Sequence, residues 1–184
     1  TYKFLTNKEL RESTIAISGI GKVGSKLSKL LFEKKTNLIV SNAGRKPIDQ
    51  LKHDKISFTE SGINSIFEQE CDIISPCALG GAINSNIKNK LKCKAIVGAA
   101  NNQLDKPETA LWLKENNIFY APDYLVNSGG VIAISCEINN SEDTLNGQLN
   151  KISDKTLSLL KESRKSSLST DKIIENFAWK RINS

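Results

Sequence analysis

Short runs of apolar residues alternate with longer segments of helical periodicity along the first two thirds of the chain. Two of the runs, TIAIS (Thr14–Ser18) and NLIVS (Asn37–Ser41), are continuous and contain several β-branched residues, as buried strands do. Between them, apolar residues recur at the i, i+4, i+7, i+8 spacing of a helix face: Val23, Leu27, Leu30 and Leu31. This stretch therefore predicts a strand, a helix that buries that face, and a second strand.

The same alternation continues to residue 122. Cys71–Ser75 and Lys94–Ala100 are further apolar runs with a helical segment expected between them, and Ile118–Pro122 is a strand-like run that ends at a proline. Shorter helical patterns lie around Ile48–Leu51 and over Thr109–Asn117. Continuous apolar strands separated by helix-length segments are typical of a parallel sheet covered on both faces. With right-handed crossovers, we expect a Rossmann-like α/β fold with a doubly wound, mostly parallel sheet.

The last third of the chain has a different pattern, with two amphipathic helices joined by the polar linker Arg164–Thr170. The first helix has one apolar face, formed by Leu145, Leu149, Ile152, Leu159 and Leu160. The second has cap candidates at Ser169–Asp171, and its apolar positions are Ile173, Ile174, Phe177 and Ile182. We therefore expect a Rossmann-like domain over residues 1–144 and C-terminal helices over 145–184 that pack on it.

Composition narrows the class of protein. The chain has 184 residues, 39% of them hydrophobic and 25% charged, and this length and balance fit one globular domain. It contains neither an apolar stretch of about 20 residues nor a signal-peptide pattern, so we expect a cytoplasmic protein that does not bind a membrane. The four cysteines form no CxxC pair and His53 is the only histidine, so we expect reduced thiols and no metal site.

A formal net charge of +6 raises the alternative of a nucleic-acid partner. The densest basic run consists of Lys88, Lys90, Lys92 and Lys94. However, the 26 basic residues are mixed with 20 acidic ones, and no predicted helix carries a continuous basic face with exposed aromatic residues. We interpret the run as a solvated helix end that leads into a strand, and we expect no nucleic-acid partner.

The segment SGIGKVGSKL places Gly19, Gly21 and Gly24 in a G-x-G-x-x-G pattern directly after the first predicted strand. In a dinucleotide-binding turn, the first glycine allows the tight turn and the second lets the backbone approach the pyrophosphate. The third lets helix and strand pack closely. The helix that begins around Lys22 and Val23 would offer free N–H groups to the phosphates. We predict a dinucleotide site here; a glycine turn that binds no ligand is the alternative.

The end of the second predicted strand indicates which dinucleotide is bound. In NAD-binding proteins an acidic residue about 20 residues after the glycines bonds the ribose hydroxyls, but Asn42 occupies that place here. Its amide can bond a 2′-hydroxyl without repelling a 2′-phosphate, and Arg45 and Lys46 could pair with that phosphate. We expect relaxed selectivity for NAD or NADP; the alternative is that both cations are solvated loop residues.

Three further motifs follow in order. They are CDIISPCALGGAIN (Cys71–Asn84), VGAANNQL (Val97–Leu104) and YAPDYLVNSGGVI (Tyr120–Ile132). Together with TIAISGIGKVG and the long C-terminal helix, they closely resemble the cofactor-binding half of the Glu/Leu/Phe/Val amino acid dehydrogenases, nearest to the leucine dehydrogenases. The resemblance implies NAD(P)-dependent oxidative deamination of an L-amino acid, such as leucine or valine, to its 2-oxo acid with release of ammonia.

The resemblance also implies a set of coenzyme-binding residues. Asn42 matches a ribose-binding aspartate and departs from it, Asn101 and Asn127 match positions beside the nicotinamide, and Val131 falls in a segment that shapes the side-chain pocket. The full expected set is Gly19, Gly21, Lys22, Val23, Gly24, Asn42, Arg45, Cys77, Ala78, Leu79, Asn101 and Asn127. For the asparagines the alternative is an Asx-turn or a loop cap. We expect Cys77 to be a passive wall residue rather than a nucleophile, because no histidine base is near it in sequence.

In the family that the chain resembles, lysines and an aspartate on a separate N-terminal domain do the catalytic work, and no lysine here matches their motif. We therefore expect no catalytic residue in this chain. One interpretation is a part of a complete, homo-oligomeric dehydrogenase, whose C-terminal helices pack toward the N-terminal domain that holds most of the amino acid pocket. The other is a free-standing, non-catalytic NAD(P)-binding module that acts as a sensor or interaction partner, and a native mass of only 20.3 kDa would favour it.

Overall fold

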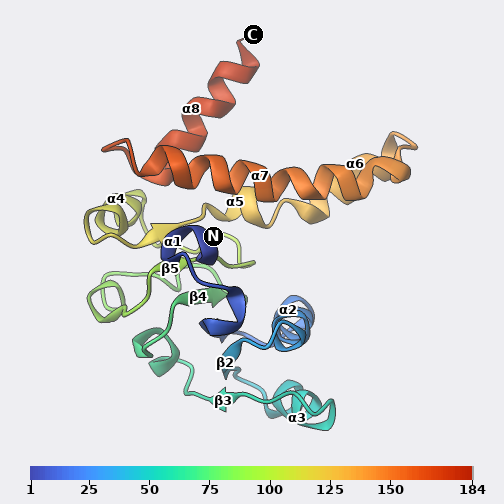
Figure 1. Ribbon diagram of the computed structural model, residues 1–184, viewed down its shortest axis with the longest axis vertical. Coiled ribbons are helices and arrows are strands. Elements are labelled where there is room, and N and C mark those ends of the chain that lie inside the picture. Colours follow the sequence, from blue (N-terminus) through green and yellow to red (C-terminus); the bar gives the residue numbers. More distant parts are fainter. Residues whose placement is uncertain (184) are drawn as a thin grey trace.

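A six-stranded sheet, parallel throughout, forms the centre of the computed structural model, which describes residues 1–183 (Figure 1). The strands are β1 (Thr14–Ser18), β2 (Asn37–Ser41), β3 (Thr59–Glu60), β4 (Ile73–Pro76), β5 (Ala95–Ile96) and β6 (Phe119–Tyr120). Their order is β3-β2-β1-β4-β5-β6, so the direction of winding reverses at β1. This is the strand order of the Rossmann fold, which confirms the expected doubly wound α/β class.

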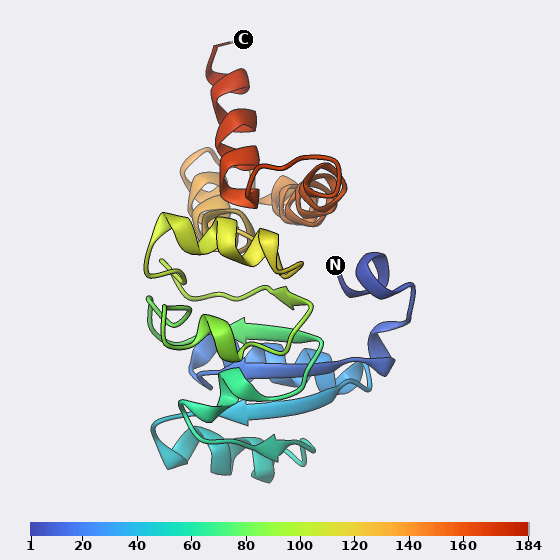
Figure 2. The same ribbon diagram turned by 90° about the vertical axis from the view of Figure 1, so that its left-hand side faces the viewer.

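Helices cover both faces of the sheet, and the last of them lie beyond its β6 edge (Figures 1 and 2). The α-helices are α1 (Tyr2–Thr6), α2 (Lys22–Glu33), α3 (Arg45–His53), α4 (Pro107–Glu115), α5 (Asp123–Val126), α6 (Gly129–Ile138), α7 (Leu145–Ser163) and α8 (Thr170–Ile182). Short 3₁₀ turns are η1 (Leu10–Glu12), η2 (Ser65–Glu68), η3 (Lys88–Lys90) and η4 (Glu142–Thr144).

The central strand β1 is buried on both sides, which explains its unbroken apolar sequence. Ile15 and Ile17 belong to a cluster on one face of the sheet, whereas Ala16 belongs to a separate cluster on the other face. Successive side chains of a strand point to opposite faces, so a strand covered on both sides needs apolar residues at every position. The first cluster also contains Leu159 and Leu160 of α7, so the C-terminal helices share a core with the sheet.

The predicted buried face of α2 is wrong at two of its four positions. Val23 and Leu30 are 57% and 51% exposed, while the other two leucines of the pattern are partly buried. The residues of α2 that are fully buried are Gly24 and Ser28. Their small side chains let the helix axis come close to the sheet, which turns the helix so that Val23 and Leu30 lie at the surface.

The segment between β4 and β5 forms no α-helix, contrary to expectation, and contains only the turn η3. Gly81 adopts a left-handed conformation with φ +67°, and the Asn84 side chain donates to the Gly81 carbonyl oxygen (3.1 Å) and accepts from the N–H of Asn86 (3.0 Å). Such side-chain bonds satisfy the backbone locally and compete with helix formation. The strands β5 and β6 are also shorter than predicted, with two residues each.

The lysine run that suggested a nucleic-acid partner is paired with carboxylates. Three of its lysines each face an acidic residue of the segment before β4: Lys90 and Glu68 (2.8 Å), Lys92 and Glu70 (3.8 Å), and Lys94 and Asp72 (2.5 Å). The fourth, Lys88, lies 5.4 Å from the centre of the Trp112 ring. The positive charge of this run is therefore largely compensated within the protein itself.

The two C-terminal helices form over the predicted residues, but only part of their apolar surface is covered. Leu159 and Leu160 of α7 and Ile173 near the start of α8 are buried. Further along α8, Phe177 and Ile182 are 41% and 70% exposed, because the helix projects away from the body of the protein (Figure 2). The predicted face of α8 is thus buried only over its first turn.

Because α7 and the sheet share a core, we expect Leu159→Ala to lower the free energy of unfolding by about 2–5 kcal/mol. The matched control is Leu157→Ala on the same helix: Leu157 is 38% exposed whereas Leu159 is fully buried, and its loss should cost less than about 1 kcal/mol. Urea denaturation followed by circular dichroism measures both values. Equal costs for the two variants would contradict the shared core.

Candidate functional site

A cleft of about 580 Å³ lies at the carboxyl ends of β1, β2 and β4, where the strand order reverses. Its lining residues from the ends of these strands are Ser18, Gly19, Ser41, Asn42, Ala43, Pro76, Ala78, Leu79 and Gly80. In open parallel sheets, ligands bind in the crevice beside such a reversal, because the loops from the two neighbouring strands diverge there. The position of this cleft agrees with the glycine pattern in the sequence.

Protein packing alone explains why two of the three glycines are needed. Gly19 has φ +102°, and a Cβ on it would lie 2.6 Å from the Cβ of Ala78. A Cβ on Gly24 would lie only 2.0 Å from the carbonyl oxygen of Gly19. The turn between β1 and α2 therefore packs backbone against backbone, and a side chain at either position would force it apart.

Gly21 differs from both of its neighbours in the motif. Its φ is −80°, which any residue can adopt, and a Cβ on it would have no protein atom within 4 Å. Gly21 is also the N-cap of α2 and provides no side chain to bond the first N–H groups of that helix. The amides at the start of α2 therefore face open space, with Lys22 exposed and Val23 largely exposed beside them.

Asn42 connects the glycine turn to the next loop. Its Oδ1 accepts a hydrogen bond from the backbone N–H of Ile20 (2.8 Å), and its Nδ2 donates to the carbonyl oxygen of Gly44 (2.8 Å). Ile20 is buried, so its N–H depends on this side chain for a partner. Asn42 therefore lines the cleft and also stabilises the turn and the loop after β2 through its two hydrogen bonds.

Arg45 begins helix α3, and it is not a loop residue as the alternative in the sequence supposed. Its guanidinium group binds two carboxylates, that of Asp49 through Nε (3.1 Å) and that of Glu60 through one terminal nitrogen (2.6 Å). Lys52 also approaches Glu60, at 3.7 Å. The expected pairing of Arg45 with a 2′-phosphate would therefore compete with carboxylates already in place, while Lys46 is exposed.

The structure brings Asn101 and Asn127 together although they are 26 positions apart. The Nδ2 of Asn127 donates to the Oδ1 of Asn101 at 2.6 Å. The N–H₂ group of Asn101 and the side-chain carbonyl oxygen of Asn127 make no hydrogen bond within residues 1–183. Close backbone packing sets this geometry, because a Cβ on Gly80 would lie 2.7 Å from the carbonyl oxygen of Asn101.

Cys77 follows β4 and is half-buried in the wall beside the glycine turn. Its N–H donates to the Ser18 carbonyl oxygen (2.7 Å), and its Sγ lies 3.5 Å from the Ser75 hydroxyl. His53, at the end of α3, is highly exposed and lies beside Asp54 instead. The contacts of Cys77 thus include no histidine base, as the interpretation of a passive wall residue requires.

Two other cysteines are unsuited to nucleophilic chemistry. Burial raises the pKa of the Cys71 and Cys93 thiols to about 12, so both stay protonated at neutral pH. Within residues 1–183, no group of three His, Cys, Asp or Glu side chains is placed to hold a metal ion. Over the same range, no helix has the length and apolar character needed to cross a bilayer.

The far wall of the cleft carries no recognisable sequence signal. It contains Phe67 from η2, which is 6% exposed, together with Ile63 and Ile87. These residues come from irregular segments with neither strand alternation nor helical spacing, so only the folded chain shows that they face the glycine turn. A flat apolar wall of this kind suits the face of an aromatic ring.

Comparison with known proteins agrees with this geometry. The model of the family described as Glutamate/Leucine/Phenylalanine/Valine dehydrogenase matches residues 35–173. A phenylalanine dehydrogenase of Thermoactinomyces intermedius is 33% identical over 99% of this chain and 50% of its own length. A leucine dehydrogenase of Bacillus subtilis (strain 168) is 40% identical over 70% of this chain and 35% of its own length. The chain thus spans at most about half the length of these curated relatives.

Solved structures show the same likeness. The crystal structure of L-tryptophan dehydrogenase from Nostoc punctiforme superposes with a TM-score of 0.91 and 31% identity, over 96% of this chain and 53% of that one. The hetero-hexameric glutamate dehydrogenase from Thermus thermophilus has a TM-score of 0.70 at 16% identity, over 92% of this chain and 45% of that one. The match to the glutamate dehydrogenase supports the fold alone, because its sequence identity is low. The match to the tryptophan dehydrogenase includes similarity in sequence as well as in fold.

Since Asn42 is, within residues 1–183, the only side-chain partner of the buried Ile20 N–H, we expect Asn42→Ala to lower the free energy of unfolding by about 1–3 kcal/mol. Asn42→Asp keeps an acceptor for Ile20 and loses only the donor to Gly44, so it should cost less. Hydrogen–deuterium exchange at the Ile20 amide reports the bond directly. Exchange should accelerate in Asn42→Ala and stay slow in Asn42→Asp; fast exchange in both would show that Asn42 does not hold the turn.

Proposed function

Since the chain belongs to the glutamate/leucine/phenylalanine/valine dehydrogenase family, we propose that it is the coenzyme-binding part of an NAD(P)-dependent amino acid dehydrogenase. The reaction is oxidative deamination of an L-amino acid, such as leucine or valine, to its 2-oxo acid and ammonia. The nicotinamide of the bound coenzyme supplies a hydride acceptor for this reaction. The residues of this chain bind and orient that coenzyme, and the amino acid binds against it.

The observation that carries the proposal is the empty space at Gly21. Packing requires Gly19 and Gly24 to lack side chains, but no protein atom explains a glycine at position 21. The space in front of this bare backbone leaves room for a pyrophosphate to lie against that position. The uncapped N-terminus of α2 beside it offers N–H donors and a partial positive charge to the phosphates.

The remaining parts of the cleft match the other parts of a dinucleotide. Asn42 lies at the edge where the adenosine ribose would bind, and the apolar wall that includes Phe67 suits the adenine ring. Next to Gly80 of the cleft, the Asn101–Asn127 pair leaves the N–H₂ group of Asn101 and the side-chain carbonyl oxygen of Asn127 unused. A nicotinamide carboxamide needs one acceptor and one donor, so this pair could hold the ring in one orientation without adding charge.

The substrate side of the reaction belongs to residues outside this chain. The amino acid needs a general base and a cation that polarises the carbonyl, and we assign neither role to a residue here. Large apolar side chains on α6 are open to solvent, with Val131, Ile134 and Ile138 between 57% and 73% exposed. We propose that a catalytic half, of the kind present in relatives about twice as long, covers this face and that Val131 borders the amino acid pocket.

We propose that charge around the ribose edge favours NAD over NADP, a narrower choice than the NAD or NADP expected from the sequence. Glu60 and Asp49 already hold Arg45, so a 2′-phosphate would have to displace a carboxylate to pair with it. Each carboxylate also repels the dianionic phosphate. Cytoplasmic location and assembly of the full-length protein into a homo-oligomer stay predictions from the sequence.

The coenzyme proposal predicts opposite effects at two glycines of one motif. Gly21→Ala should change the free energy of unfolding by less than about 1 kcal/mol, because the new methyl group meets no protein atom. It should nevertheless weaken NADH binding by at least about tenfold, since the methyl group occupies the pyrophosphate space. Gly24→Ala should lower the free energy of unfolding by about 1–3 kcal/mol through its clash with the Gly19 carbonyl oxygen.

Fluorescence titration with NADH and urea denaturation give these two quantities for each variant. Gly147→Ala, at another glycine with no atom near its would-be Cβ, lies in α7 and serves as the control that should bind NADH normally. If Gly21→Ala binds NADH as tightly as the parent chain, the space beside Gly21 is not the pyrophosphate site and the proposal fails.

A second prediction concerns coenzyme choice. Glu60→Gln removes a charge that holds Arg45 at 2.6 Å, so it should raise affinity for NADPH by about two- to fivefold, the range expected for one exposed ion pair. Affinity for NADH should stay nearly constant. The control is Glu70→Gln, which neutralises a carboxylate whose ion-pair partner in the described part of the chain is Lys92. Equal gains for NADH and NADPH, or an equal gain in the control, would remove the role of Glu60.

A further inference from the structure

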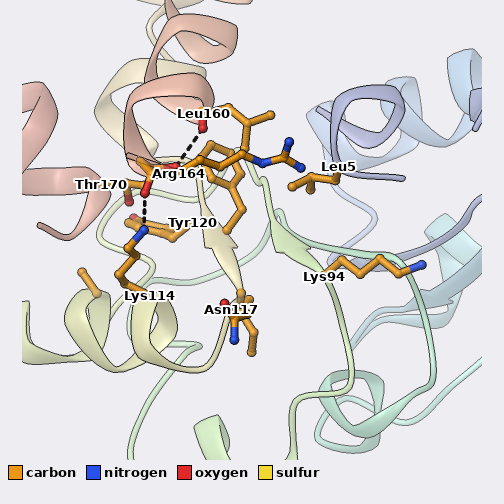
Figure 3. A pocket seen from close by; sticks show the side chains of 12 residues that line it. Leu5, Lys94, Lys114, Asn117, Tyr120, Leu160, Arg164 and Thr170 are labelled. Carbon is orange, nitrogen blue, oxygen red and sulfur yellow. Dashed lines mark hydrogen bonds between the residues drawn. The ribbon is translucent and has the colours of Figure 1, made fainter. Parts of the chain in front are cut away.

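A second cavity, of about 300 Å³, lies at the opposite ends of the strands from the glycine turn (Figure 3). It includes Lys94, directly before β5, and Ile118, directly before β6. Its other walls come from α1, α4, α7 and α8. No residue is common to this cavity and the coenzyme cleft. The cavity is therefore separate from the proposed dehydrogenase site, and the inference below does not depend on that function.

The lining of this cavity is cationic. It contains Lys94, Lys114 and Arg164, and no aspartate or glutamate. Lys94 is held by Asp72 outside the cavity at 2.5 Å, which leaves Lys114 and Arg164 as charges without a carboxylate partner within residues 1–183. Lys114 donates to the carbonyl oxygen of Ser163, so two of its three N–H donors make no hydrogen bond within residues 1–183.

A buried hydroxyl beside Lys114 also lacks a partner. Thr170 is 4% exposed, lines the cavity, and its Oγ1 makes no hydrogen bond within residues 1–183. Figure 3 shows its side chain next to the end of Lys114. Thr170 is also the first residue of α8, a helix of 13 residues whose N-cap, Ser169, forms no side-chain cap bond. Ammonium, hydroxyl and helix N-terminus thus all favour an anion at one place.

The acidic residue nearest in sequence is Asp171, which lies next to Thr170 in the first turn of α8 but is absent from the lining of the cavity. Its backbone carbonyl oxygen accepts from the Tyr124 hydroxyl at 3.2 Å, and burial together with the charge of Asp171 raises the pKa of Tyr124 to about 12. One oxygen of the Asp171 carboxylate, Oδ1, is itself buried and makes no hydrogen bond within residues 1–183.

The rest of the lining is apolar. Leu5 from α1, Ile118, Phe119 and Leu160 from α7 form walls beside the cationic end. The guanidinium group of Arg164 extends toward Leu5, where it lies 4.4 Å from the centre of the Phe4 ring (Figure 3). A bare inorganic anion would leave these walls uncovered, whereas an anion with a short apolar body would cover them and bring its charge to Lys114.

We propose that this cavity binds a small organic carboxylate with a short aliphatic body. The carboxylate accepts hydrogen bonds from Lys114 and Thr170, and the aliphatic body lies against Leu5, Ile118 and Leu160. Such a ligand connects α4 at the sheet edge with α7 and α8. Because it binds only the folded arrangement of these elements, it stabilises the docking of the C-terminal helices.

The simpler account is structural: Lys114 caps the C-terminus of α7 through the Ser163 carbonyl oxygen, and the cavity stays filled with water. Calorimetric titration of the full chain separates the two accounts with three probes. They are 4-methylpentanoate, the neutral 4-methylpentan-1-ol of the same shape, and inorganic phosphate. We expect the carboxylate to bind at least about tenfold more tightly than either of the others, since a hydrogen bond to a charged group and the apolar contact both contribute.

Two variants locate the binding. Lys114→Met should weaken the carboxylate by roughly 10- to 100-fold. Thr170→Val removes the unpartnered hydroxyl without changing the shape, so it should leave the thermal midpoint unchanged or raise it while weakening the carboxylate by roughly two- to tenfold. The controls are Lys161→Met and Thr156→Val on α7, neither of which lines the cavity. Thr170→Val tests the proposal even if Lys114→Met fails to fold.

Saturating NADH should leave carboxylate affinity unchanged, and carboxylate binding that persists in a chain unable to bind NADH would still support this site. Binding of the alcohol or of phosphate as tight as that of the carboxylate overturns the proposal. So does an affinity that Thr170→Val leaves unchanged, or one that the control variants reduce equally.

Discussion

The closest backbone contact at the first crossover determines much of this structure. The carbonyl oxygen of Gly19 lies where a Cβ at position 24 would have to be, only 2.0 Å away. The missing side chain at Gly24 lets α2 lie close to the end of β1. The segment after β4 packs against the same turn through Ala78. Once these three segments meet, the loops after β1 and β4 must diverge, and the cleft at the reversal of strand order follows from that divergence.

Charge is distributed so that most of it is compensated locally, although the chain carries a formal net charge of +6. The acidic residues before β4 face the lysines before β5, which neutralises the densest basic run. At the ribose edge of the cleft, Arg45 is held by Asp49 and Glu60. The lining of the second cavity carries no carboxylate, and within residues 1–183 neither Lys114 nor Arg164 there has one as a partner. The charged groups beside the first cleft are therefore compensated, whereas two cations in the second cavity are not, a difference that the overall composition does not reveal.

The C-terminal helices lie beyond the β6 edge of the sheet and share a core with it. Leu159 and Leu160 join the core that contains Ile17, while α8 leaves the body after its first turns and exposes Phe177 and Ile182 (Figure 2). The second cavity lies where α7 and α8 meet the β6 edge, so its occupancy bears on how firmly these helices dock. An apolar surface left open on α6 and α8 fits a chain that spans about half the length of its relatives.

The sequence by itself determined the fold class, the approximate positions of the main strands along the chain and the glycine motif, because these depend on local patterns: continuous apolar strands and glycines at fixed spacing. Through the resemblance of whole motifs it also predicted a common role for Asn101 and Asn127, and the structure brings these two side chains into contact. Tertiary structure alone decided what each side chain contacts. Val23 is exposed because Gly24 turns α2, Arg45 meets a carboxylate 15 residues away, and Asn42 serves a buried N–H 22 residues before it. Local pattern carries no information on such distant partners, since they depend on how strands and loops stack after the chain has folded.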